Sequence, residues 1–429
     1  MVRTPASRLR LSLALWALAL GASGAWAQDE GRVPGKNLLE ARLGFKTKLL
    51  RQERDEEAPE RPHPGLFSLV SFKGPAGQLQ AYLGKPPGPG KHPAIVWITG
   101  GFPPGGAGSF AWEPSDPDND QSAQAYRHAG LIMMYPFLRG AGGNPGVQEG
   151  FFGEVDDVLA AAEYLSQAPG VDPQRIYLGG HSTGGTLALL VAAASDRFKA
   201  VISFGPVDDP AGYGADVLPY DPQDAQEARL RAPIHFLGAI RSPTFVIEGT
   251  ERGNYESLQA LEKASQNPLL RCLPVRGADH FDVLAPSNAL IARRLAALEA
   301  GGTLQLDALD LAKALESRRR ADREADDLQT LAELRRDEVD LRAAHALRWI
   351  VLGREEKALQ RAGKDAQGLG FEAEPLVKES DREGRPYFVL RLKRSLTLTD
   401  LPALFASSAA VADLARKAEL QYAGWERAE

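Results

Sequence analysis

Short apolar runs alternate with helical patterns through the middle of this chain, and the alternation restricts the possible folds strongly. Six such runs are bounded by glycine or proline, as buried strands often are. They lie at residues 94–98, 131–135, 176–178, 200–204, 244–247 and 269–275. Between several of them, apolar residues recur at the 3.6-residue spacing of an amphipathic helix. The pattern predicts an α/β fold whose mostly parallel sheet is covered by helices on both faces.

One further segment precedes this alternating region, and another interrupts it. Residues 66–72 and 79–83 are predicted as paired antiparallel strands, joined by a tight turn at 74–77. Residues 205–240, by contrast, interrupt the rhythm of strands and helices with Asp-Pro turns and a polar helical stretch. This insertion either covers a cleft as a lid or decorates the surface.

The N-terminus has the pattern of an export signal. Three arginines precede an apolar run at 11–20, and the sequence Ala-Trp-Ala follows at 25–27 as a cleavage pattern. The run is about half of the roughly 20 apolar residues that span a bilayer. We therefore expect residues 1–27 to be a cleaved signal peptide, which would leave a periplasmic or secreted protein without a membrane span.

Charge and cysteine content exclude several classes of protein. The formal net charge is −6, and loss of the three N-terminal arginines makes it more negative, so nucleic acid is not an expected partner. The single cysteine, Cys272, cannot form an internal disulfide. The glycines at 99–106 lack the Lys-Ser/Thr pair of a phosphate-binding loop. Neither a metal nor a cofactor is expected.

The strongest chemical signal is the run Ile-Tyr-Leu-Gly-Gly-His-Ser-Thr-Gly-Gly-Thr-Leu-Ala at 176–188. Its order of strand, G-x-S-x-G turn and helix is typical of an exposed nucleophilic serine at a helix N-terminus. The glycines at 180 and 184 fit this interpretation, because side chains there would collide with neighbouring backbone. We therefore predict that Ser182 is a catalytic nucleophile.

A serine nucleophile needs a base, which in this topology follows the serine in the chain and lies after a later strand. The chain has seven histidines. Six of them precede the sheet, lie in helical or inserted segments, flank Ser182, or belong to the C-terminal part. His280 follows the last predicted strand, in the sequence Gly-Ala-Asp-His-Phe-Asp, and is the predicted base.

The sequence leaves several candidates for the acid that orients the histidine. The acid is expected on the loop after the strand at 244–247, where Glu251 is the leading candidate. Glu248 is an alternative, although its side chain would point into the flank of the strand. Asp208 and Asp209 follow the preceding strand and could reach the histidine from a neighbouring strand end.

An oxyanion hole requires two backbone N–H groups that point at the developing negative charge. Thr183, directly after the serine, is predicted to supply one of them. The loop at 99–106 follows the third strand and would supply the other, from Gly101 or Phe102, because its glycines permit close approach of the backbone.

These residues together resemble α/β-hydrolases of the prolyl oligopeptidase and dienelactone hydrolase type. The similarity spans about residues 66–300 and includes an Arg-Gly-Ala-Gly-Gly loop at 139–143. It implies a mostly parallel sheet with flanking helices and a Ser–His–acid triad. One departure concerns the acid. Family members usually carry aspartate three residues after the glycine that follows the seventh strand, and here that position is Arg252.

The composition of the chain changes in its C-terminal part. Residues 301–343 are charge-dense and helical, which we interpret as a solvated linker. Residues 344–429 then show the α+β ferredoxin-like order βαββαβ. Their Gly-Leu-Gly-Phe-Glu-Ala-Glu sequence at 368–374 and their ending Gln-Tyr-Ala-Gly-Trp-Glu resemble the regulator of ribonuclease E activity B, an RraB-type domain. From this resemblance we take the fold, and we expect a protein partner whose identity stays open.

The sequence therefore predicts an exported serine hydrolase, an esterase or a prolyl oligopeptidase-like peptidase. It would cleave the ester or amide bond of a small ester or peptide through an acyl-enzyme. The alternative is a non-catalytic binding or regulatory protein on a hydrolase scaffold, because the usual acid position holds Arg252 and a second domain is appended. The predicted segments are the signal peptide 1–27, an N-terminal extension 28–65, the hydrolase domain 66–300, the linker 301–343 and the ferredoxin-like domain 344–429. A chain that ends at residue 302 is expected to fold and stay active.

Overall fold

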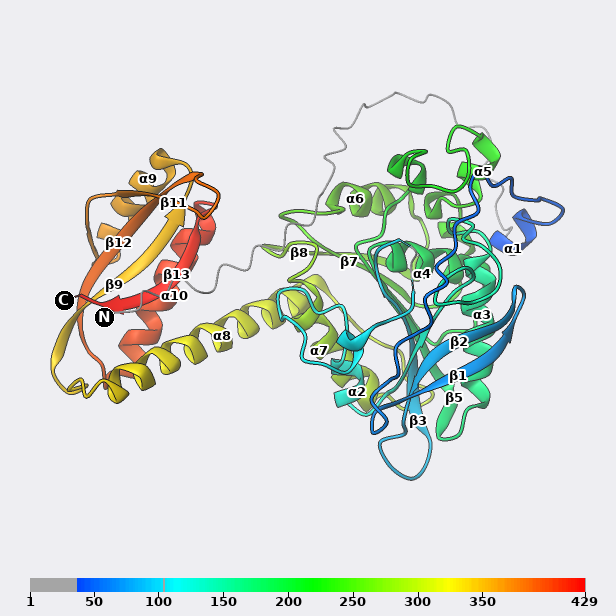
Figure 1. The fold of residues 1–429 in the computed structure, drawn as a ribbon, viewed down its shortest axis with the longest axis horizontal. Helices are drawn as coiled ribbons and strands as arrows, with labels where there is room; N and C mark the ends of the chain where they lie inside the picture. The colour runs from blue at the N-terminus through cyan, green and yellow to red at the C-terminus, as the bar shows by residue number, and fades with distance from the viewer. Residues whose placement is uncertain (1–36, 103–104, 429) are drawn as a thin grey trace. The chain divides into compact units, whose positions relative to one another are not determined.

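The computed structural model describes residues 37–102 and 105–428 (Figure 1). The predicted signal peptide at 1–27 lies outside these residues. The described part contains two sheets, one of mostly parallel strands and one of antiparallel strands. Over the same residues, every helix is too short or too polar to cross a membrane.

The first sheet follows the order β1-β2-β4-β3-β5-β6-β7-β8. Strands β1 and β2 form the predicted antiparallel hairpin, β2 pairs antiparallel with β4, and the remaining neighbours are parallel. The strands are β1 (Phe67–Gly74), β2 (Gly77–Gly84), β3 (His92–Ile98), β4 (Ile132–Pro136), β5 (Val171–His181), β6 (Val201–Phe204), β7 (Thr244–Gly249) and β8 (Leu270–Val275). Each of the six predicted apolar runs overlaps one of the strands β3 to β8, so the predicted α/β-hydrolase fold is confirmed.

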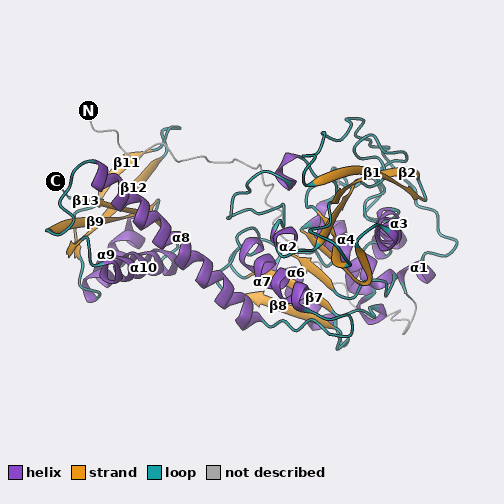
Figure 2. Ribbon diagram, turned by 90° about the horizontal axis from the view of Figure 1, so that it is seen from below, coloured by secondary structure: helices purple, strands orange, loops and turns teal. Residues whose placement is uncertain are grey.

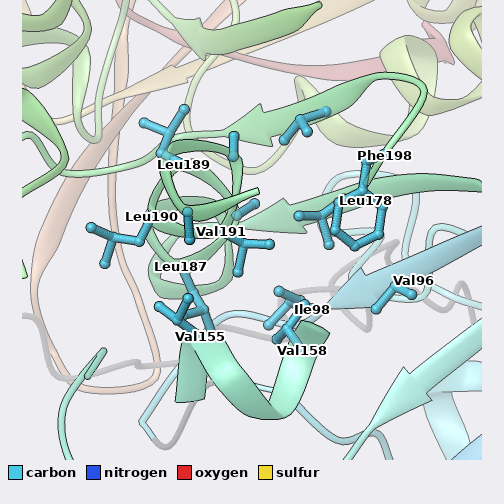
Figure 3. Packing of buried hydrophobic residues seen from close by; sticks show 14 of the residues in the cluster. Val96, Ile98, Val155, Val158, Leu178, Leu187, Leu189, Leu190, Val191 and Phe198 are labelled. Carbon is cyan, nitrogen blue, oxygen red and sulfur yellow. The ribbon is translucent and has the colours of Figure 1, made fainter. Parts of the chain in front are cut away.

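Helices cover both faces of this sheet, because successive side chains of a buried strand point to opposite sides. On β3, Val96 and Ile98 face one core and Trp97 faces the other. The first core includes the helices α3 (Glu154–Gln167), α4 (Thr183–Ala194) and α6 (Tyr255–Ala264), and the second includes α2 (Ala125–His128) and α7 (Leu284–Ala297). Figure 3 shows the first core, with Val155 of α3 beside Leu187 of α4.

The predicted insertion at 205–240 consists of short helical turns. They are η2 (Pro210–Tyr213), α5 (Ala225–Arg229), η3 (Pro233–His235) and η4 (Leu237–Ala239). The insertion is anchored to the first core by several buried side chains, among them Tyr220 and Phe236. The preceding extension contributes α1 (Leu38–Ala41), whose Leu38 is buried in the same core. The insertion is therefore a packed part of the domain.

Helix α8 (Ala308–Arg336) differs from the solvated linker that its charge content predicts. Leu304 and Leu306, just before the helix, and Leu311 and Leu315 within it are buried in the second core of the first domain. A chain that ends at residue 302 would lose these four leucines and leave the apolar surface of α7 uncovered. The predicted boundary at residue 300 is therefore too early, because the hydrophobic core continues into the first half of α8.

The second sheet has the order β10-β12-β9-β13, with β11 also paired to β12, and all its pairs are antiparallel. Figure 2 shows this sheet as orange strands with helices beside it. Its elements are β9 (Ala344–Gly353), α9 (Glu356–Gly368), β10 (Glu372–Ala373), β11 (Val377–Ser380), β12 (Pro386–Thr397), α10 (Leu401–Lys417) and β13 (Gln421–Arg427). The single strand predicted at 371–377 is divided into β10 and β11. The order of elements is otherwise the predicted ferredoxin-like βαββαβ.

The second half of α8 belongs to the core of this second domain. Leu331 packs in its hydrophobic cluster, and the buried Asp327 carboxylate accepts hydrogen bonds from Trp425 of β13 and Ser408 of α10. The Ser408 hydroxyl in turn accepts from the indole N–H of Trp349 in β9. Burial raises the pKa of Asp327 to about 6. One charged side chain of α8 thereby links three elements of the second domain.

We predict that Leu311→Ala lowers the stability of the first domain by about 2–4 kcal/mol, because truncating a buried leucine leaves a cavity in the core. Leu309 lies on the same helix and is 62% exposed, so Leu309→Ala should change stability by no more than about 0.5 kcal/mol. Urea unfolding of the full chain compares the two variants. Equal stabilities would show that α8 is a spacer rather than part of the core.

Candidate functional site

Ser182 lies in the sharp turn between β5 and α4. Its backbone has φ 57° and ψ −118°, a left-handed conformation that non-glycine residues rarely adopt. A Cβ added at Gly180 would lie 2.4 Å from the carbonyl oxygen of Gly184, and one added at Gly184 would lie 2.2 Å from that of Ile98. Only glycine permits these approaches, as the sequence predicts. The turn leaves Ser182 partly exposed at the N-terminus of α4.

His280 follows β8 and is held by a buried carboxylate. Its Nδ1 lies 2.8 Å from Oε2 of Glu248, the penultimate residue of β7. The two side chains are 3% and 0% exposed. The other carboxylate oxygen of Glu248 accepts a hydrogen bond from the N–H of Gly249 at 2.8 Å. Because the carboxylate can only accept, the proton of the neutral imidazole is on Nδ1, and Nε2 carries the basic lone pair.

Of the predicted acid candidates, the alternative Glu248 lies within hydrogen-bonding distance of His280, and the leading candidate Glu251 is placed elsewhere. Glu251 is exposed, and its backbone N–H donates to the carbonyl of Ala278, so the loop after β7 lies beside the segment that follows β8. The two other candidates have structural partners. Asp208 accepts a hydrogen bond from the Ser257 hydroxyl, and Asp209 caps the turn η2 through the N–H of Ala211.

The serine turn, His280 and Glu248 lie at the carboxyl ends of the neighbouring parallel strands β5 to β8. Gly205, directly after β6, marks the meeting point, because a Cβ there would lie 2.4 Å from both Oε2 of Glu248 and Cε1 of His280. The preceding residue, Phe204, accepts a hydrogen bond at its carbonyl from the N–H of Ser182 at 2.8 Å. Gly205 therefore gives the imidazole room beside the serine turn.

His181, the residue before the serine, also supports the site. Its Nε2 lies 3.0 Å from the carbonyl oxygen of His280, and the centroids of the two imidazole rings are 4.4 Å apart. Burial, and to a lesser extent the neighbouring His280, holds the pKa of His181 well below its usual range. A neutral His181 can donate from Nε2 to the main chain of His280. In the sequence His181 is only the neighbour of the serine, and no pattern there predicts this contact.

The two predicted sources of oxyanion donors lie next to the serine. The N–H of Thr183 is at the start of α4, and a Cβ added at Gly100 would lie 3.1 Å from the Cβ of Ser182. The Thr183 hydroxyl donates to the carbonyl of Gly101 at 2.5 Å. In a trans peptide the N–H points opposite to the preceding carbonyl. The Thr183 side chain therefore fixes the orientation of the peptide group that joins Gly101 to Phe102, the two residues predicted as the second donor.

Aromatic rings border the loop that follows β3, of which residues 99–102 and 105–106 are described and which we call the oxyanion loop. The ring of Phe102, 43% exposed, meets Phe151 and Tyr213 edge to face, with centroid distances of 5.9 Å and 5.1 Å. Tyr213 belongs to the insertion, so the insertion reaches the oxyanion loop, as the lid interpretation requires. Within residues 37–102 and 105–428, the side chains of His, Cys, Asp and Glu form no group arranged to hold a metal ion.

Comparisons with known families agree with both resemblances. Residues 151–262 match the family described as prolyl oligopeptidase family, and residues 324–426 match the family described as regulator of ribonuclease activity B. The first match contains Ser182 and Glu248. It confirms the class of enzyme predicted from the sequence, a serine hydrolase.

Individual proteins are similar to part of this chain. An uncharacterized peptidase, YtmA, of Bacillus subtilis (strain 168) is 24% identical over 202 residues, which are 41% of this chain and 70% of that protein. The acylaminoacyl peptidase of Pyrococcus horikoshii is 17% identical, with a TM-score of 0.44 over 57% of this chain and 44% of the other. A puromycin-hydrolyzing peptidase of Mycobacterium tuberculosis is 19% identical, with a TM-score of 0.45 over 56% of this chain and 41% of the other. The chain thus spans less than half the length of these two solved peptidases.

We predict that Glu248→Gln lowers kcat by roughly 10²- to 10⁴-fold, because an amide cannot stabilise the imidazolium that forms when His280 accepts a proton. Glu251→Gln is the matched control, since it makes the same change on an exposed side chain three residues later, and should leave kcat within about twofold. Initial rates with an activated ester compare the variants. A large loss in Glu251→Gln, with Glu248→Gln active, would restore the prediction from sequence.

Proposed function

We propose that this chain is an exported serine hydrolase that cleaves an ester or amide bond through an acyl-enzyme, with Ser182, His280 and Glu248 as its triad. The observation that carries the proposal is the buried Glu248–His280 pair beside the serine turn. A fully buried carboxylate is costly unless a partner compensates its charge. A triad gives this pair a function, because the imidazole becomes positively charged during the reaction.

Acylation would begin with attack by Ser182 Oγ on the carbonyl carbon of the substrate. As the new C–O bond forms, the serine proton moves to Nε2 of His280, and Glu248 stabilises the imidazolium through Nδ1. The proton then passes to the leaving oxygen or nitrogen as its bond to carbon breaks. Water, deprotonated by the same imidazole, hydrolyses the acyl-enzyme and regenerates the serine.

The developing negative charge on the carbonyl oxygen would be bound by the backbone N–H groups of Thr183 and Phe102. Thr183 is the first residue of α4, so the positive end of the helix dipole adds to its N–H. The second donor has its direction set by the hydrogen bond from the Thr183 hydroxyl to Gly101. Thr183 would thus donate one hydrogen bond through its own N–H and orient the second donor, the N–H of Phe102, through its hydroxyl.

The non-catalytic alternative has lost its main support. It arose because Arg252 occupies the position where family members usually carry the acid and because a second domain is appended. The structure provides a carboxylate from inside β7 instead, at 2.8 Å from the histidine. We therefore favour the enzyme. A small ester or peptide is the substrate we propose, and we assign a protein partner to the second domain, as its RraB-type match suggests.

The export part of the proposal rests on the sequence of residues 1–27. Expression of the full chain in a bacterial host should give a periplasmic or secreted protein that begins at Gln28, because a signal peptidase cuts after the Ala-Trp-Ala sequence. Sequencing of the mature N-terminus after cell fractionation measures this. Recovery of an uncut chain in the cytoplasm would refute export and leave the catalytic proposal intact.

The catalytic proposal predicts that a fluorophosphonate probe labels the full chain at Ser182, because such probes react quickly only with an activated serine. Ser182→Ala should abolish labelling and reduce ester hydrolysis to a background about 10⁴- to 10⁶-fold lower in kcat, with little change in thermal stability. Mass spectrometry identifies the labelled residue. Labelling at another serine, or activity that survives Ser182→Ala, would disprove the assignment. Rates with matched ester and peptide substrates then decide the bond that is cleaved.

A further inference from the structure

The loop that carries His280, residues 277–282, is closed on itself by two aspartates, and we refer to it as the histidine loop. The Asp279 carboxylate accepts from the N–H groups of Phe281 and Asp282 at 2.9 Å and 3.0 Å. In the opposite direction, Oδ1 of Asp282 accepts from the N–H of Asp279 at 2.8 Å. These hydrogen bonds join residues on either side of His280 in the sequence. The position of its imidazole therefore depends on where Asp279 and Asp282 lie.

A side chain from outside the sheet region holds both ends of this loop. Nη2 of Arg319, in α8, donates to the carbonyl oxygen of Gly277 at 2.9 Å and to Oδ2 of Asp282 at 2.5 Å. The Arg319 and Asp282 side chains are 23% and 21% exposed, so the ion pair is partly shielded from water. Each oxygen of Asp282 therefore has a separate role, one within the loop and one toward α8.

The position of Arg319 follows from the packing of its helix. Leu311, Leu315 and Arg319 are spaced by four residues, so they lie along one face of α8. The two leucines are buried in the core of the first domain. This packing brings the arginine to the histidine loop. The neighbours Arg318 and Arg320 instead pair with carboxylates four residues ahead on their own helix.

We propose that Arg319 is a positioning residue for the catalytic histidine, which makes α8 part of the machinery of the hydrolase; this inference rests on the proposed function. Arg319 acts through Asp282 and the backbone of the histidine loop and does not touch the reacting atoms. His181 holds the same loop from the sheet side, through the carbonyl of His280. The imidazole is thus located between a contact from β5 and a contact from α8.

Loss of Arg319 should affect substrate binding and proton transfer differently. The oxyanion loop and the serine turn lie on elements that Arg319 does not contact, so substrate binding should survive its loss. Proton transfer should become slower, because it depends on the distance and direction from the imidazole to the serine oxygen. Loss of Arg319 is therefore expected to lower kcat and to leave KM nearly unchanged.

The test uses the full chain and the variants Arg319→Ala, Asp282→Asn and the double variant. A fluorophosphonate titration counts the competent sites in each preparation, and rates with an activated ester are divided by that count. We expect kcat per titrated site to fall roughly 5- to 50-fold in each single variant, with KM within about twofold. The double variant should lose no more than the worse single variant, because both changes break the same Arg319–Asp282 contact.

Arg320→Ala is the matched control, since it removes the adjacent guanidinium, which is 75% exposed at its side chain, from the same helix. Its kcat should stay within about twofold of that of the full wild-type chain. If Arg319→Ala does not fold, Asp282→Asn still breaks the ion pair from the other side. Losses that multiply in the double variant, or kcat per site equal to that of Arg320→Ala, would overturn the inference. A wild-type chain that the probe does not label would overturn the proposed function itself.

Discussion

Three segments of backbone approach one another closely around Ser182, and the arrangement of the site depends on this contact. The turn at 180–185 lies against the carbonyl oxygens at the ends of β3 and β6. A Cβ at Gly185 would lie 2.3 Å from the carbonyl of Phe204, in addition to the approaches at Gly180 and Gly184. The contact holds the left-handed backbone of Ser182, and every residue of α4 is buried behind it. Strain in the turn is therefore supported by the packing of a whole helix.

The positions of the strands, the serine turn and the place of His280 after the last strand could be predicted because each has a local signature. Apolar runs mark the strands, the glycine pattern marks the turn, and His280 follows the last strand of the sheet. The acid has no such signature. Glu251 stands on the expected loop, whereas Glu248 lies inside a strand in which all residues are buried. The sequence did contain a signal, since a carboxylate at the end of a buried strand requires a partner. The direction in which the Glu248 side chain finds this partner depends on the fold of the loop after β7, which the sequence does not show.

The role of α8 was hidden from the sequence for a different reason. Its high charge predicts a solvated helix, and most of its side chains are indeed exposed. The residues that decide its packing are few. Leu311 and Leu315 are buried in one core, and Asp327 and Leu331 are buried in the other. These pairs are separated by twelve or more residues, so no single window of sequence shows an amphipathic face that extends along the helix.

Charged side chains hold this helix at both of its packed halves, in chemically different ways. Arg319 donates to a carbonyl and a carboxylate of the histidine loop, where partial exposure keeps the cost of desolvation moderate. Asp327 accepts from two neutral donors, and burial raises its pKa to about 6 although both hydrogen bonds favour the carboxylate. The guanidinium of Arg319 is planar, and its Nη2 serves two acceptors at the two ends of the histidine loop, so the two bonds together set its direction. The contact nearer to His280 is thus fixed in direction, which is the property that positioning an imidazole requires.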